Sequence, residues 1–464
     1  MPDRKLELLR SLPSVTDLLK SQVVAGWLGR HPQPLVTECL RRALDQIRNQ
    51  ILADTATGAP VDAVLALAER HLATATEPHV RVAINGTGII LHTGLGRAVL
   101  PASVIDSLAA ELRGYCTLAV DRETGQRAER DELIEYILTE LTGAEAATVV
   151  NNNAAATTLA LAALAASKEV IVSRGQLIEI GGSFRLPEVM AQSGARLVEV
   201  GATNRTHLKD YQKAITENTA AILRVHPSNY RVVGFTSEVP LRELSALCRR
   251  HHLMLIDDLG AGALVDLKPF GLPHEPTVRE SIEAGADAVL FSGDKLIGAG
   301  QCGIIVGKKT LVEKLRRHPL MRAVRVDKTC LMLLERTLQL FRDPERLVRE
   351  HPTYRMLSAS LADLRARAEK LVQLMAAVAP RVKTEIRPSQ CFLGSGSLPT
   401  EAIASFDVIL SVPCHSADDL ARRLRLDDAC IFGRIEDDCV RLDVRTLTDD
   451  QLPQIAAALG RITA

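Results

Sequence analysis

A lysine at the end of an apolar run is the strongest chemical feature of the sequence. Phe291-Ser292-Gly293-Asp294-Lys295 closes that run, and a glycine-rich loop follows. A lysine at the carboxyl edge of an open α/β sheet lies where such sheets bind ligands. In a partly desolvated site its pKa falls, so it can form a Schiff base, with Ser292 and Asp294 orienting it or a bound cofactor. Taken alone, the Asp-Lys pair fits a solvated turn better.

Two aspartates end another apolar run upstream. Asp257 and Asp258 follow residues 253–256, and Asp258 lies about one strand–helix–strand unit before Lys295. A carboxylate at this place can pair with a protonated ring nitrogen, which the electron sink of pyridoxal phosphate requires. The alternative interpretation is an aspartate that caps the following segment.

A polar loop precedes an alanine-rich stretch. Asn151-Asn152-Asn153 follow the apolar residues 148–150, and Ala154 begins the alanine-rich stretch. The backbone N–H groups and dipole of a helix start bind phosphate well, so Asn152, Asn153 and Ala154 are candidate phosphate contacts. Ordinary N-capping would need only one of these asparagines. Phosphate loop, ring-nitrogen aspartate and lysine occur in the order expected for a fold-type I pyridoxal phosphate enzyme.

The turn Ser173-Arg174-Gly175-Gln176 follows the next apolar run. Such enzymes often place there the side chain that stacks on the cofactor ring. No His or Tyr is present in this turn, so Gln176 or a neighbour is expected to cover the ring.

Short β-branched runs alternate with helical patterns from residue 84 to about residue 342. Near-continuous apolar strands separated by helices predict a parallel sheet covered on both faces, and hence an α/β fold. The expected strands are residues 148–150, 170–172, 197–200, 221–225, 254–256, 288–291 and 303–306.

Two further regions flank this core, which we place at residues 73–342. Residues 1–72 carry Leu and Ile near helical spacing, with 9 Lys+Arg and 8 Asp+Glu, and indicate a small helical bundle or dimerisation arm. Residues 343–464 indicate a smaller α+β domain with a long helix at 354–378. Its expected strands are residues 408–412, 429–432 and 440–443.

Composition excludes several functional classes. The 464 residues are 47% hydrophobic, which excludes disorder, and 56 Lys+Arg balance 56 Asp+Glu, which argues against a globally basic DNA or RNA binder. With only 3% aromatic residues, a base-stacking platform is also disfavoured. We see no targeting or membrane segment. The nine cysteines form no CxxC pair, so no metal site is expected, and their odd number fits a reducing cytoplasm.

Several longer segments carry a family resemblance that covers nearly the whole chain. The chain resembles bacterial selenocysteine synthase, the L-seryl-tRNA(Sec) selenium transferase. The resemblance rests on Ile84-Asn85-Gly86-Thr87-Gly88, on Leu91-His92-Thr93-Gly94-Leu95-Gly96-Arg97, and on residues 150–156, 173–185, 199–207, 291–295, 303–309, 318–328 and 394–399.

This resemblance implies a reaction on a tRNA-bound amino acid. It implies a homodecamer built from dimers, with pyridoxal phosphate on Lys295 until seryl-tRNA(Sec) displaces it. The freed Lys295 would then take the Cα proton. Loss of the seryl hydroxyl would give an aminoacrylyl-tRNA, and selenium from selenophosphate would add to it, yielding selenocysteinyl-tRNA(Sec).

The resemblance also implies roles for further residues. Arg97, Arg322 and Arg325 match family positions thought to hold selenophosphate, and guanidinium forks suit a tetrahedral oxyanion. Residues 308–350 carry 12 Lys+Arg and 6 Asp+Glu, which supports an anion-binding role only in part, because a solvated basic helix has the same composition. Asp294 matches an active-site aspartate, and Asn229 matches a cofactor-site motif.

Two other functions remain open from the sequence. One is a related pyridoxal phosphate lyase that acts on a small amino acid or an amino-sugar acid phosphate. Such relatives generally lack the N-terminal helical domain, so the residues ahead of Ile84 favour tRNA as the substrate. The other is an RNA-binding scaffold without catalysis, against which Lys295 and Asp258 argue, since binding alone needs no electron sink.

Overall fold

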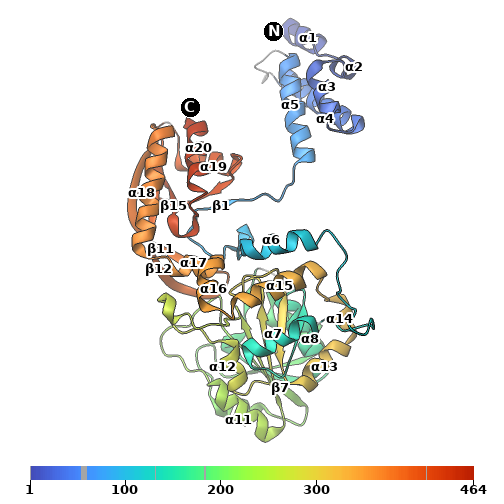
Figure 1. Cartoon of the computed structure of the whole chain (residues 1–464), viewed down its shortest axis with the longest axis vertical. Coiled ribbons are helices and arrows are strands. Elements are labelled where there is room, and N and C mark those ends of the chain that lie inside the picture. The colour runs from blue at the N-terminus through green and yellow to red at the C-terminus, as the bar shows by residue number, and fades with distance from the viewer. Residues whose placement is uncertain (1, 54–59, 131, 182–183, 414, 464) are drawn as a thin grey trace. The chain divides into compact units, whose positions relative to one another are not determined.

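The computed structural model describes residues 2–53, 60–130, 132–181, 184–413 and 415–463 (Figure 1). The chain forms two compact units, Met1–Val82 and Ala83–Ala464, and each is described by itself. Cys414, and residues 182–183 within the family-like segment 173–185, lie outside the described residues. None of the described helices is both long and apolar enough to cross a membrane.

The first unit is helical. Its described helices are α1 (Pro2–Arg10), α2 (Val15–Leu18), α3 (Gln22–Leu28), α4 (Gln33–Leu52) and α5 (Pro60–Thr76). Ser21 begins α3 by accepting the Val24 N–H, and Trp27 on the same helix is buried. The side chains at Val36, Leu40 and Ile47 on α4 recur at helical spacing and are buried in a core of this unit alone. The last helix continues past the expected boundary at residue 72.

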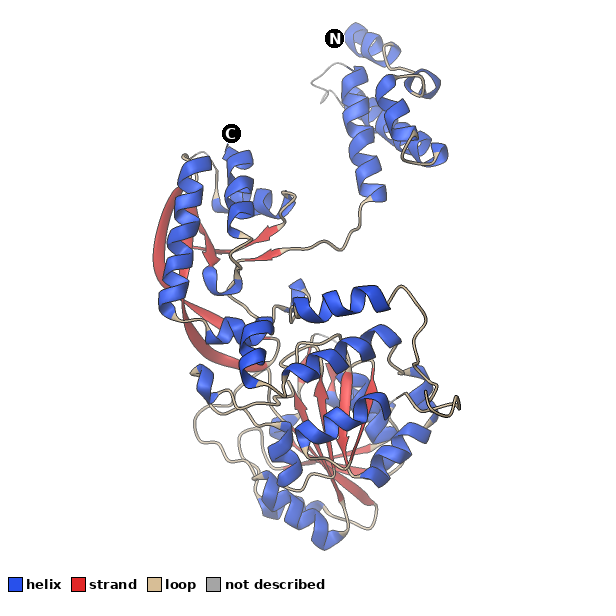
Figure 2. Cartoon of the chain, in the orientation of Figure 1, coloured by secondary structure: helices blue, strands red, loops and turns tan. Residues whose placement is uncertain are grey.

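A seven-stranded sheet forms the centre of the second unit (Figure 2). Each of the seven apolar runs predicted to form strands does so. In spatial order the strands are β2 (Ala146–Val150), β10 (Gly303–Gly307), β9 (Ala288–Ser292), β8 (Met254–Gly260), β7 (Thr219–Val225), β3 (Glu169–Ser173) and β6 (Arg196–Val200). The predicted α/β fold is therefore confirmed.

One strand of the sheet runs against its neighbours, so the sheet is mostly parallel, as the fold-type I resemblance implies. Strand β10 runs antiparallel to both neighbours, with Gly303 opposite Ser292 on β9 and opposite Val150 on β2. The chain passes from β9 to β10 through the Lys295 loop, which is shorter than a parallel crossover requires. The sheet is thus mostly parallel, and the close approach of β10 brings the Lys295 loop beside the loop that follows β2.

Helices cover both faces of this sheet. Alternate residues of β9 enter different cores: Val289 and Phe291 pack with α7 (Glu132–Thr142) and α15 (Lys328–Leu340), whereas Leu290 packs with α8 (Asn153–Ala165). This alternation is the two-residue period of a strand buried on both faces. The buried sheet fixes the strand ends from which the candidate site is built.

The C-terminal part corrects two sequence expectations. The predicted long helix at 354–378 is two helices, α17 (Pro352–Ser358) and α18 (Leu361–Val378), because Ala359 is extended and the Ser360 side chain accepts the Asp363 N–H to start a new helix. Strand β12 (Ser397–Ser411) begins well before the expected 408 and pairs antiparallel with β11 (Lys383–Gly394), which the sequence did not reveal.

The remaining C-terminal strands divide between two sheets. Strand β15 (Cys439–Asp443) pairs with β12 and with β14 (Arg434–Glu436). The expected strand at 429–432 is the short β13 (Ile431–Phe432), which pairs in parallel with β1 (Ile84–Asn85). This pairing joins the C-terminal part to the start of the second unit.

Candidate active site

Lys295 lies in a tight loop directly after β9. Its backbone oxygen accepts the Gly298 N–H at 3.0 Å, and the Gly293 N–H donates to the Cys302 oxygen at 2.9 Å. The side chain is buried, and this burial, together with the charge of Arg97, lowers the pKa of the Lys295 ammonium. A lysine with a lowered pKa holds more of the neutral amine that attacks a carbonyl.

Asp258 lies on β8 and is buried among hydrogen-bond donors. Its Oδ1 accepts from Asn153 Nδ2 at 2.9 Å and from the Gly260 N–H at 3.1 Å, and its Oδ2 accepts from Thr157 Oγ1 at 3.0 Å. Burial raises the pKa of Asp258, while these hydrogen bonds and Lys295 oppose the rise by favouring the carboxylate. The side chain is therefore held in one orientation by two donors from α8 and one from its own strand.

The N-terminus of α8 lies beside this carboxylate. Asn152 caps the helix, with its Oδ1 accepting the Ala155 N–H at 2.8 Å. Capping and phosphate binding are compatible here, because the cap occupies one side chain and leaves the helix dipole directed at the pocket. Asn153 and Ala154, at the first positions of the helix, line the same pocket.

Asp294, next to the lysine, forms an ion pair with Arg97. Arg97 Nη1 lies 2.5 Å from Asp294 Oδ2, and both side chains are mostly buried. Arg97 has a φ of 65°, a left-handed conformation that few side chains adopt. The ion pair joins the family-like segment around Gly96 to the Lys295 loop.

The Lys295 loop, Asp258, Arg97 and the start of α8 line one cavity of about 310 Å³. Two of its lining atoms, Asn153 Oδ1 and Ser228 Oγ, are buried without a hydrogen-bond partner among the described residues. Buried polar atoms of this kind are normally paired, so they suit a bound polar group. Together with Lys295, Asp258 and the start of α8, they fit pyridoxal phosphate.

Eight of the twelve predicted site residues line this cavity and four do not. Those inside are Arg97, Asn152, Asn153, Ala154, Asp258, Ser292, Asp294 and Lys295. Gln176 instead accepts the Val225 N–H at 3.1 Å, and Asn229 donates to the Glu179 oxygen at 2.8 Å. Apolar surface near Gln176 comes from Ile178 and Phe184.

Arg322 and Arg325 lie in a different place from Lys295. Arg325 lines a recess of about 90 Å³ together with Arg127 and Arg130. The positive charges of Arg130, Arg322 and Arg127 lower the pKa of Arg325, the effect of Arg130 being the largest. Arg322 lies on α14 (Pro319–Ala323), whereas Arg325 follows the helix and bridges to Val150 on β2. The four arginines form an anion-attracting cluster at the edge of the sheet.

Sequence reasoning missed His226, which lines the cavity, and two residues that contact its lining, Thr157 and Glu275. His226 follows β7, and its Nε2 lies 3.3 Å from Glu275 Oε1. Thr157 lies four positions after Asn153 and so on the same helix face, a signal that could have revealed it. His226 directly follows an apolar run, as Asp258 does, but Glu275 lies in a loop without any periodic signal. No cluster of His, Cys, Asp and Glu suited to a metal ion occurs in the described part of the chain.

The fold, the buried lysine and the aspartate beside a helix N-terminus define a fold-type I pyridoxal phosphate enzyme. A solved structure of D-glucosaminate-6-phosphate ammonia-lyase is similar, with a TM-score of 0.57 and 22% identity, covering 84% of this chain and 99% of that chain. This likeness shows the shared fold.

Sequence comparison identifies the particular family. The L-seryl-tRNA selenium transferase pattern matches residues 83–448, and the selenocysteine synthase N-terminal pattern matches residues 9–48. The chain is 46% identical to the L-seryl-tRNA(Sec) selenium transferase of Caldanaerobacter subterraneus subsp. tengcongensis, covering 98% of this chain and 99% of the relative. It is 48% identical to that of Methylocella silvestris, covering 95% of each. The chain therefore belongs to the L-seryl-tRNA selenium transferase family.

Proposed function

We propose that this enzyme converts L-seryl-tRNA(Sec) to L-selenocysteinyl-tRNA(Sec), with pyridoxal phosphate held on Lys295. The observation that carries the proposal is the cavity in which a buried Lys295 lies with a buried Asp258 and the start of α8. Relatives with this activity in their names match almost the full chain. Identification of the amino acid esterified to tRNA after reaction tests the proposal.

The cofactor contacts follow from the positions of three groups. Lys295 would form the covalent link, Asp258 would pair with the ring nitrogen, and the N–H groups at the start of α8 would bind the phosphate. When bound, pyridoxal phosphate stores the electron pair released at the substrate Cα. The hydrogen bonds from Asn153 and Thr157 favour the carboxylate form of Asp258, which is the form that would pair with a protonated ring nitrogen.

Lys295 is also the group that moves the substrate proton. The lowered pKa increases the fraction of neutral Lys295 amine, and this amine would be the base that takes the substrate Cα proton. Asp294 is a positioning residue, since its ion pair with Arg97 fixes the start of the Lys295 loop. Loss of the seryl hydroxyl precedes the addition of selenium.

The selenium donor in this proposal is selenophosphate. Arg97 reaches the cofactor cavity, and Arg322 and Arg325 supply further positive charge from the neighbouring arginine cluster. The mutual repulsion of these arginines favours an oxyanion among them, because an anion relieves the like-charge contacts. The cluster is linked to the phosphate-binding loop by the Asn151 N–H, which donates to the Val324 oxygen at 2.9 Å.

The first unit is proposed to bind tRNA. It has its own hydrophobic core, and residues 9–48 within it match the N-terminal pattern of the family. The whole enzyme is proposed to be a cytoplasmic decamer built from dimers. Val233 is 84% exposed and Phe235 is 85% exposed, and such apolar side chains suit contacts between subunits.

A further inference from the structure

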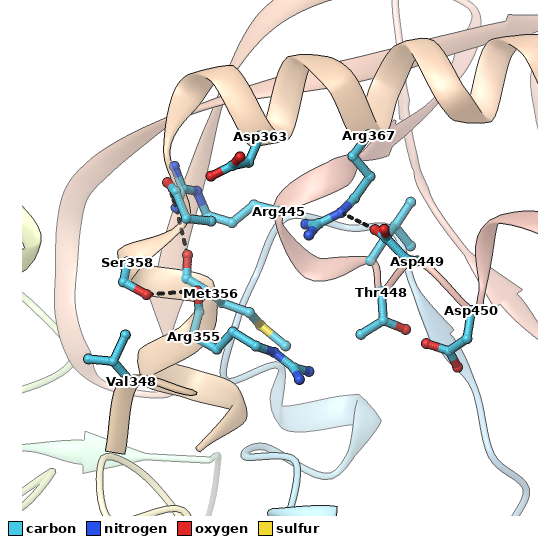
Figure 3. Close-up of a pocket in the computed structure, with 12 residues that line it drawn as sticks. Val348, Arg355, Met356, Ser358, Asp363, Arg367, Arg445, Thr448, Asp449 and Asp450 are labelled. Carbon is cyan, nitrogen blue, oxygen red and sulfur yellow. Dashed lines mark hydrogen bonds and ion pairs between the residues drawn. The ribbon is translucent and has the colours of Figure 1, made fainter. Parts of the chain in front are cut away.

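A second pocket lies in the C-terminal part of the second unit, away from the cofactor cavity. It has a volume of about 510 Å³ and is formed by α17, the start of α18 and the segment after β15 (Figure 3). None of its lining residues lines the cofactor cavity. Its wall combines apolar side chains, such as Met356 and Leu447, with several charged groups.

Arg445 supplies a buried positive charge in this wall. The residue is only 3% exposed, and its guanidinium donates to the oxygens of Met356 at 2.6 Å and Ala404 at 2.6 Å. Its Nε is buried without a partner among the described residues, and the nearby charge of Asp443 acts on the guanidinium without an ion pair between the two in the described structure. Carbonyl oxygens satisfy donors but do not neutralise charge, so this pocket wall attracts an anionic group.

Two more arginines line the same space. Arg367 forms an ion pair with Asp449 at 3.0 Å, whereas the Arg355 guanidinium has no hydrogen-bond or ion-pair partner within the described residues. Figure 3 shows Arg355, Arg367 and the hydroxyl of Thr448 around one open space. Guanidinium groups and a hydroxyl placed in this way suit a carboxylate.

The acidic residues of the pocket restrict the chemistry of the ligand. Asp363, Asp449 and Asp450 balance the three arginines, so the lining carries no net formal charge. Such a lining disfavours a phosphate dianion. It suits a ligand that carries one positive and one negative group, because Asp450 lies across the open space from Arg355 in Figure 3 and its carboxylate has no side-chain partner in the described structure.

We propose that this pocket binds a free α-amino acid as a zwitterion. Its carboxylate lies between Arg355 and Arg367, its ammonium group lies on Asp450, and its side chain contacts Met356 and Leu447. This inference goes beyond the proposed catalytic function and does not depend on it.

Titration calorimetry on the full-length holoenzyme tests the proposal. The probes are the twenty ribosomal amino acids, each tested singly, with propionate, ethylamine and inorganic phosphate for comparison. At least one amino acid is expected to bind without changing the visible absorbance of the cofactor and at least about tenfold more tightly than the three comparison compounds. Failure of all twenty to bind, or equal binding of phosphate or propionate, overturns the proposal.

Three variants locate the binding. Arg355→Gln and Asp450→Asn are each expected to weaken amino acid binding at least about tenfold, because each removes one charged contact. Arg422→Gln changes an exposed arginine on α19 (Ala417–Leu426) outside the pocket and is expected to leave binding unchanged. Binding that persists in Arg355→Gln, or that shifts the cofactor spectrum, belongs elsewhere and contradicts the proposal.

Discussion

Arg97 Nη1 lies 2.5 Å from Asp294 Oδ2, so a residue near the start of the catalytic unit is ion-paired with the neighbour of Lys295. The arrangement gives Arg97 two electrostatic effects. Arg97 neutralises the charge of Asp294 through the ion pair, and its own positive charge lowers the pKa of Lys295. Both effects favour the neutral lysine amine.

Removal of Arg97 should shift cofactor uptake to higher pH. In Arg97→Leu the pKa of Lys295 rises, because a positive neighbour is lost and Asp294 becomes unpaired. A Schiff base needs the neutral amine, so less reactive lysine is present at any given pH below that pKa. The measurement is the rate at which visible absorbance appears when pyridoxal phosphate is added to apoenzyme across a pH series.

The conservative variant provides the control for this shift. Arg97→Lys retains a positive charge and should move the midpoint of the pH profile less than Arg97→Leu does. A midpoint that stays fixed or falls in Arg97→Leu would show that Arg97 does not set the pKa of Lys295.

Substitutions at the adjacent Asp257 and Asp258 should affect different properties: Asp258→Asn the activity and Asp257→Asn the stability. Asp258→Asn is expected to lower kcat by about 10²–10³-fold, because the charge facing the ring nitrogen is lost. The variant should still bind cofactor through Lys295. Steady-state kinetics with seryl-tRNA(Sec) and the visible spectrum measure the two properties, and a kcat equal to that of the native enzyme would remove Asp258 from this role.

Asp257→Asn is the matched change with the opposite outcome. Asp257 is fully buried and forms an ion pair with Arg224 at 2.8 Å. Loss of the carboxylate leaves Arg224 buried and unpaired, which should lower the free energy of unfolding by about 3–5 kcal/mol. Chemical denaturation measures this, and the folded variant should retain kcat. A large loss of kcat with unchanged stability would reverse the two assignments.

Loss of an arginine from the cluster should impair the addition of selenium. Arg322→Ala is expected to impair formation of selenocysteinyl-tRNA(Sec) more than loss of the seryl hydroxyl, because it removes positive charge that binds the donor. Raising selenophosphate should partly restore the rate. Arg317→Ala removes an exposed arginine on α13 (Lys309–Arg317) and serves as the control. Equal loss of both steps in Arg322→Ala would argue against a role in donor binding.

Deletion of residues 1–82 should separate tRNA binding from cofactor binding. The second unit has its own cores, so the shortened protein should fold and bind pyridoxal phosphate. Its affinity for tRNA(Sec) should fall at least about tenfold, as measured by filter binding at fixed salt. Undiminished affinity would assign tRNA binding to the second unit.

The central strands could be predicted because each is buried on both faces. Continuous apolar runs such as those of β9 and β10 give an unambiguous signal, although their relative direction depends on the loop between them. The hairpin β11–β12 could not be predicted from the sequence, because polar residues such as Arg387 and Gln390 interrupt β11 and only part of each strand is buried. The break between α17 and α18 at Ala359 could not be predicted, because it depends on the Ser360 side chain capping α18.

The candidate site was predictable where residues end buried strands. Asp258 and Lys295 follow apolar runs, so their meeting at one sheet edge follows from the α/β order. The orientation of Gln176 could not be predicted, because its hydrogen bond to the Val225 N–H depends on how β3 and β7 pair. The separation of Arg325 from the cavity likewise depends on its bridge to Val150.

The most direct measurement is the identity of the amino acid on the tRNA after reaction. Holoenzyme is incubated with seryl-tRNA(Sec) and selenophosphate, the ester is hydrolysed, and the released amino acid is identified by mass spectrometry. The account predicts selenocysteine with the native enzyme and unchanged serine with Lys295→Ala. Unchanged serine with the native holoenzyme, or selenocysteine from Lys295→Ala at the native rate, would contradict it.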